Sequence, residues 1–137
     1  MAILNKAVAV YLMLTALAVA VLLIITPLIH DGSDSYPLWE VLNYFMVPGV
    51  LAVLVANYLC KRRQDASDRS DLAGSLVFYG AIALTMLFFW EWFWTLNPNS
   101  ETGNAAISHT VYFPLVDALY TVLALTTGRE LWRESEG

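Results

Sequence analysis

Five ionisable side chains that could do chemistry lie along an otherwise apolar chain. Carboxylates and imidazoles bind transition metals such as Cu and Zn, carry protons and attract cationic solutes. Within a membrane-spanning segment such residues are candidates for function, because a lone charge at the bilayer centre costs about 3 kcal/mol on insertion scales. One interpretation is therefore a metal, proton or cation site that consists of His30, Glu40, Glu91, His109 and Asp117.

The same residues also fit an interpretation without any site. Glu40 and Asp117 each lie three residues after a proline, where the positive N-terminal end of a helix stabilises a carboxylate. Glu91 would reach water from an aromatic-rich boundary, and both histidines would lie in loops. The chain has no Glu-x-x-His or His-Glu-x-x-His motif, and Cys60 is its single cysteine, so the sequence carries no catalytic signature of these types. An enzyme is the less favoured expectation.

Four long apolar segments must position these residues. They span residues 7–29, 38–60, 72–96 and 107–128, and each is close to the roughly 20 residues with which a helix crosses about 30 Å of hydrocarbon. The last helix is expected at 113–132, because Pro114 fits the first turn of a helix. The hydrophobic fraction of 58% exceeds the roughly 45–50% typical of soluble domains. We predict an all-α, integral membrane four-helix bundle that forms a single domain over residues 1–137.

Basic residues indicate the orientation of this bundle. All seven fall on one side of it: Lys6, Lys61, Arg62, Arg63, Arg69, Arg129 and Arg133. By the positive-inside rule, both termini and the loop over residues 61–71 are cytoplasmic, and Lys61, Arg62 and Arg63 form a basic anchor at the lipid surface. The net charge of −5 is divided between both faces, so nucleic acid is not an expected partner.

Aromatic residues gather at the opposite, outer boundary. The run over residues 88–94 contains Trp90, Trp92 and Trp94. Tryptophan is enriched at membrane interfaces, and large aromatic side chains also anchor contacts between proteins. We therefore expect these tryptophans to form either an aromatic belt or a contact surface for a neighbouring subunit.

A short internal repeat relates the two halves of the chain. The pattern Pro-Leu-x-acid-x-Leu begins at Pro37 and again at Pro114. One interpretation is a pair of repeated helical hairpins in parallel orientation, related by an axis along the membrane normal; a chance match is the other. Within the second helix, Pro48 and Gly49 are expected to kink the helix or to allow close packing.

Two functions from different classes remain open. The first is a small noncatalytic subunit, structural or for assembly, of a larger membrane complex such as an oxidoreductase, with membrane lipids and other subunits or further copies of itself as partners. The second is a unit that binds or transports a small solute, a proton or a metal ion through the outer acidic and histidine cluster. Copurification in mild detergent discriminates the two, because stoichiometric partners favour the first, and a stable homo-oligomer with bound metal favours the second.

Overall fold

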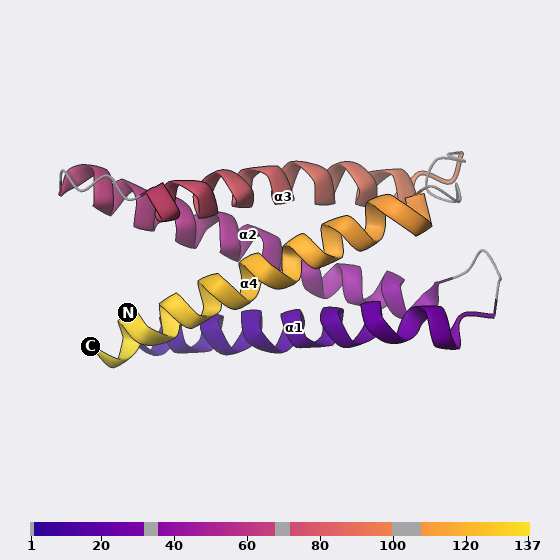
Figure 1. The fold of residues 1–137 in the computed structure, drawn as a ribbon, viewed down its shortest axis with the longest axis horizontal. Coiled ribbons are helices and arrows are strands. Elements are labelled where there is room, and N and C mark those ends of the chain that lie inside the picture. The colour runs from indigo at the N-terminus through magenta and orange to yellow at the C-terminus, as the bar shows by residue number, and fades with distance from the viewer. Residues whose placement is uncertain (1, 32–35, 68–71, 100–107) are drawn as a thin grey trace.

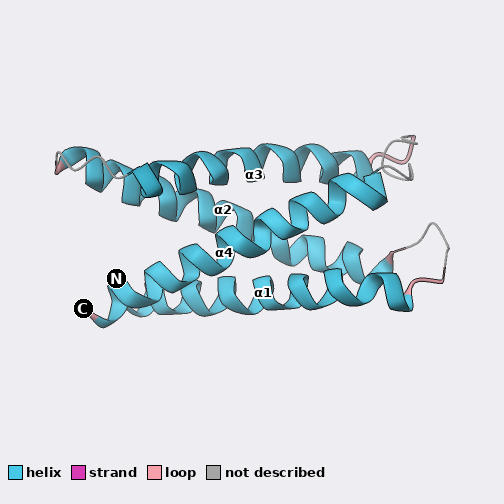
Figure 2. Ribbon diagram, viewed as in Figure 1, coloured by secondary structure: helices cyan, strands magenta, loops and turns pink. Residues whose placement is uncertain are grey.

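The computed structural model describes residues 2–31, 36–67, 72–99 and 108–137, and Figure 2 shows that nearly all of this is helix. The elements in chain order are α1 (Ala2–Ile29), α2 (Pro37–Ala66), α3 (Leu72–Leu96), the π-helical turn η2 (Ser108–Tyr112) and α4 (Phe113–Glu136). Within the described ranges, four helices are long and apolar enough to cross a membrane. The all-α four-helix bundle is therefore confirmed, and the chain has the character of an integral membrane protein.

The helix bounds differ from the predicted ones mainly at the polar ends. Helix α3 begins and ends as expected, whereas α1 begins at Ala2, α2 continues to Ala66 and α4 continues to Glu136. The expectation that residues 61–66 belong to a loop was wrong. Charged side chains can extend a helix into water when they pair one turn apart. Lys61 and Asp65 do so with a 2.8 Å ion pair in α2.

Helices α2 and α4 cross at the middle of the bundle (Figure 1). Helices α1 and α3 lie at the two edges of the view, and α2 and α4 cross between them, so that α4 runs from α1 at one end to α3 at the other. Both chain termini, the end of α2 and the start of α3 lie together at what we call the terminal end. The end of α1, the start of α2, the end of α3 and the start of α4 meet at the opposite, distal end.

Helix α4 packs most extensively against α1. The two backbones come close at Gly128, where an added Cβ would lie 3.0 Å from Met13 Cγ and 3.1 Å from the Ala9 carbonyl oxygen. Small residues at such crossings let membrane helices gain close van der Waals contact, which replaces the hydrophobic effect as the force between helices in lipid. Less than half of each membrane-spanning window is buried within the chain, from 17% in α3 to 39% in α4.

Three helices meet at Tyr120, which is fully buried at the centre of the bundle. Its hydroxyl oxygen lies 2.7 Å from Thr15 Oγ1 of α1. From the other side α2 approaches through Gly49, where an added Cβ would overlap the Tyr120 hydroxyl. Helix α2 is continuous through Pro48, so the proline does not end it. The close packing predicted at Gly49 is confirmed.

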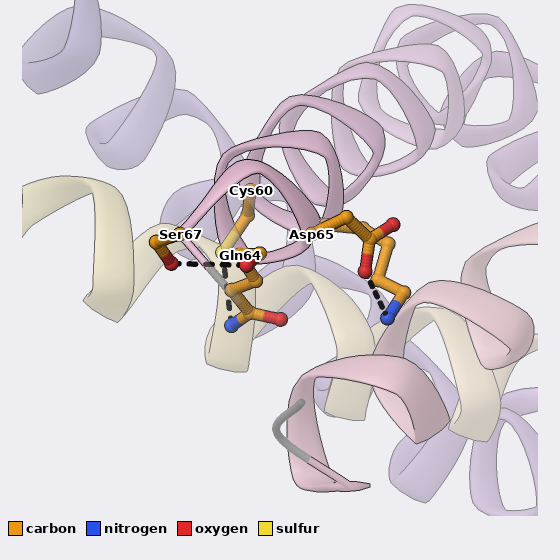
Figure 3. A network of polar contacts seen from close by, with 5 residues as sticks. Cys60, Gln64, Asp65 and Ser67 are labelled. Carbon is orange, nitrogen blue, oxygen red and sulfur yellow. Dashed lines mark hydrogen bonds and ion pairs between the residues drawn. The ribbon is translucent and has the colours of Figure 1, made fainter. Parts of the chain in front are cut away.

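Polar contacts join α2 to α4 toward the terminal end. Asn57 Nδ2 donates to Thr127 Oγ1 at 2.8 Å, and Arg63 pairs with Glu134 at 3.4 Å. In the last turns of α2, Gln64 Nε2 lies 3.7 Å from Cys60 Sγ, as drawn in Figure 3. Cys60 thus lies within a side-chain network of α2.

The orientation of the bundle across the membrane stays a prediction, and exposed positions at the two ends can test it. Asn99 lies just after α3 at the distal end, and Asp65 lies near the end of α2; both are exposed. In a Cys60→Ser background, we expect a membrane-impermeant maleimide to label Asn99→Cys in intact cells and to label Asp65→Cys only after permeabilisation. Labelling in the reverse pattern would overturn the orientation.

The contact between Gly49 and Tyr120 predicts a steric effect on stability. Gly49→Ala should lower the free energy of unfolding by about 1–3 kcal/mol, as overpacking does, because the new methyl group meets a buried, hydrogen-bonded hydroxyl. The matched control is Gly80→Ala, whose nearest neighbour would be Leu123 Cδ2 at an ordinary 3.4 Å. Denaturation in detergent measures both variants, and adding Tyr120→Phe to Gly49→Ala should recover part of the loss. Equal stability of the two alanine variants would contradict the packing described.

Candidate functional site

A cavity of about 460 Å³ lies among the helices at the distal end. This volume falls within the roughly 300–1,000 Å³ of small-molecule sites. All four helices contribute to the lining, which consists of Leu23, Thr26, Pro27, Tyr36, Trp39, Glu40, Asn43, Tyr44, Trp92, Thr95, Leu96, Phe113, Pro114 and Asp117. The cavity follows from the crossing of the helices, since α4 leaves α1 and approaches α3 toward this end (Figure 1).

Hydrogen bonding and ring packing between helices hold the aromatic walls of the cavity in place. Trp39 Nε1 of α2 donates to Thr26 Oγ1 of α1 at 2.9 Å. Across the cavity, Tyr44 of α2 meets Trp92 of α3 edge-on, with ring centroids 5.6 Å apart at 89°. Each of these contacts joins two helices, so the positions of Trp39, Tyr44 and Trp92 are set by helix packing.

Asp117 is the most deeply buried carboxylate in the cavity lining. It lies on the inward face of α4, one turn before Tyr120, and only 5% of its surface is exposed. No residue in the described part of the chain donates a hydrogen bond to its carboxylate. Burial of a charged group without a partner is costly, so this side chain calls for a positive partner or a proton.

Glu91 is a second buried carboxylate, beside the cavity rather than in its lining. It is 6% exposed and lies on the inward face of α3 that also carries Leu84 and Phe88. It lies close enough to Asp117 for the two carboxyl groups to interact across the interface between α3 and α4. The expectation that Glu91 simply reaches water through the aromatic boundary was wrong. Instead, its carboxyl group is buried between α3 and α4, close to Asp117.

Glu40 and Asn43 supply polar groups on the α2 side of the cavity. Glu40 is exposed and lies in the first turn of α2, as predicted. Tyr36, Glu40, Asn43 and Tyr44 recur at helical spacing, so they share one face. That spacing is the signal from which Asn43 and the two tyrosines could have been found in the sequence.

Neither histidine is among the described residues that line the cavity. The His30 ring stacks on Tyr36, with centroids 4.3 Å apart at 10°, and it is Tyr36 that lines the cavity. The side chain of His109 lies outside the described residues. Within residues 2–31, 36–67, 72–99 and 108–137, no three His, Cys, Asp or Glu side chains are grouped so that they could hold a metal ion.

The three tryptophans of α3 divide between two surfaces. Trp92 lines the cavity. Trp90 is 52% exposed and packs edge-on against Trp94, with ring centroids 6.2 Å apart. Only the Trp90–Trp94 pair is therefore placed to meet lipid or a neighbouring protein.

Among the described residues that line the cavity there is no Lys or Arg. The basic residues that the structure describes lie in the first turns of α1, the last turns of α2 and the last turns of α4. All of these segments are at the terminal end in Figure 1. The cavity therefore combines carboxylates, hydroxyls, an amide and aromatic faces, which together suit a cation.

The burial of Asp117 predicts a gain in stability when its charge is removed. Asp117→Asn has nearly the same shape, so at neutral pH and without ligand it should raise the free energy of unfolding by about 1 kcal/mol or more. Glu40→Gln is the matched control, because that carboxylate is exposed and its replacement should change stability by less than about 0.5 kcal/mol. Unfolding in detergent provides the measurement. A destabilised Asp117→Asn variant would show that the carboxylate has a favourable partner.

In comparisons with known proteins, no family model, curated protein or solved structure matches this chain. A function for it therefore has to be argued from the distal cavity and its side chains.

Proposed function

We propose that this protein binds a small cationic solute in the distal cavity, which faces the outer side of the membrane. The observation that carries the proposal is Asp117, a carboxylate that is 5% exposed, lines the cavity and receives no hydrogen bond from the described residues. A buried carboxylate gains most from a partner that brings positive charge and donates hydrogen bonds at once, as an ammonium group does.

The aromatic walls support the same class of ligand. Aromatic faces attract cations, with energies of about 0.5–2 kcal/mol each, depending on solvent exposure. Trp39, Tyr44 and Trp92 contribute rings to the lining. A cation that reaches Asp117 would lie among these rings, and the positive-inside rule supports an opening toward the outer side.

The role of a noncatalytic subunit in a larger complex stays a second proposal. Its specific support is the Trp90–Trp94 pair, of which Trp90 is 52% exposed, since exposed aromatic pairs are typical of contact surfaces. The two proposals use different surfaces of α3. Copurification of stoichiometric partners in mild detergent would support the subunit role without bearing on the cavity.

Thermal unfolding of the detergent-solubilised protein tests the cation proposal. Butylammonium chloride should stabilise the protein in a saturable way, by about 2.7 kcal/mol at a hundredfold excess over its dissociation constant, because it binds only the folded state. Sodium chloride at equal ionic strength and neutral butanol should not. Asp117→Asn should lose this stabilisation, whereas Asp65→Asn, at an exposed carboxylate of the terminal end, should retain it.

Two outcomes would count against the proposal. One is the absence of any saturable response to the cation. The other is an equal response in the wild-type protein and in Asp117→Asn, since the cation would then bind elsewhere.

A further inference from the structure

The geometry points to a dicationic aliphatic amine, with an ammonium group at each end of a short hydrocarbon chain, as the ligand of the distal cavity. This inference rests on the proposed function and names its ligand class. One ammonium group would meet Asp117 at the deep end, and the other would meet Glu40 at the exposed side.

Two carboxylates at different depths line the same cavity. Asp117 comes from α4 and is 5% exposed, whereas Glu40 comes from the first turn of α2 and is exposed. None of the lining residues that the structure describes is a Lys or Arg that could neutralise either one. A single positive charge at Asp117 would leave Glu40 to solvent, while two charges on one molecule satisfy both.

Apart from the two carboxylates, much of the cavity lining consists of apolar and aromatic side chains. Leu23 and Pro27 of α1, Trp39 of α2, and Trp92 and Leu96 of α3 all line the cavity. A chain of methylene groups gains about 0.8 kcal/mol per group when such surface removes it from water. This surface therefore suits an alkyl chain better than it suits a hydrated ion.

The size and donor set of the cavity argue against a bare metal ion. A cavity of about 460 Å³ is far larger than the space that a metal ion held by protein ligands at about 2 Å needs. In addition, the described residues include no group of three potential metal ligands. Glu91 is buried nearby, but it does not line the cavity.

The test compares diamines with monoamines of equal length on the full chain in detergent. Isothermal titration with the 1,3-, 1,4-, 1,5- and 1,6-diaminoalkanes and with the corresponding alkylammonium ions should show one preferred diamine length. At that length the diamine should bind about fivefold more tightly than the monoamine, a modest factor because one of the two ion pairs is exposed to water.

Two variants assign the two ends of the ligand. Glu40→Gln should abolish the difference between the preferred diamine and its monoamine. Asp117→Asn should lose both ligands. Circular dichroism and gel filtration verify that each variant is folded, and Glu40→Gln keeps the inference testable on its own because it alters an exposed residue.

The outcomes separate this inference from the proposed function. Equal affinity of diamines and monoamines in the wild-type protein, or a diamine preference that survives Glu40→Gln, would overturn the diamine assignment and leave cation binding intact. If neither class binds, the proposed function itself fails.

Discussion

The rest of the structure depends on the close meeting of three helices at Tyr120. Its hydroxyl contacts Thr15 of α1, and Gly49 of α2 leaves the space that the ring needs. Helix α4 is thereby held against both neighbours at the middle of the bundle and must separate from α1 as it approaches α3 (Figure 1). The distal cavity is the consequence of that separation. A straighter bundle in which α4 followed α1 throughout would bring Asp117 against apolar side chains.

In such a bundle a carboxylate has few favourable environments. Lipid surrounds most of each helix, since no more than 39% of any membrane-spanning window is buried inside the chain, and lipid offers no hydrogen bonds. A carboxylate must then reach water, find a donor, take up a proton or face a cavity that a cation can enter. Glu40 reaches water at the start of α2. Asp117 and Glu91, in contrast, are both buried and lie near each other. Packing alone does not account for two buried carboxyl groups to which no described residue donates a hydrogen bond.

Helix length and apolar composition were sufficient to predict the fold, and the bounds of α3 agree with the structure because Leu72 and Leu96 coincide with the limits of its apolar run. The depth of Asp117 was not predictable in the same way. Asp117 follows Pro114 in the same Pro-Leu-x-acid-x-Leu pattern in which Glu40 follows Pro37. Pro114 does lie in the first turn of α4. However, Asp117 lies past the first turn and faces the core, so its interpretation as a helix-start carboxylate was wrong. Which side of a helix turns inward is decided by tertiary packing, here by Tyr120, and a six-residue pattern does not contain that information.

The π-helical turn η2 affects whether the fold can tolerate the loss of a residue just before α4. A π turn closes its hydrogen bonds over one residue more than an α turn does, and η2 runs directly into α4. Deletion of a single residue within η2 would convert it to a regular α turn, while Asp117 and Tyr120 would keep their direction because packing fixes α4 downstream. The turn η2 therefore contains one residue more than a regular α turn needs at this point. A one-residue deletion here would be absorbed before it reaches the cavity, whereas the same deletion between Asp117 and Tyr120 would rotate the carboxylate relative to the packed tyrosine.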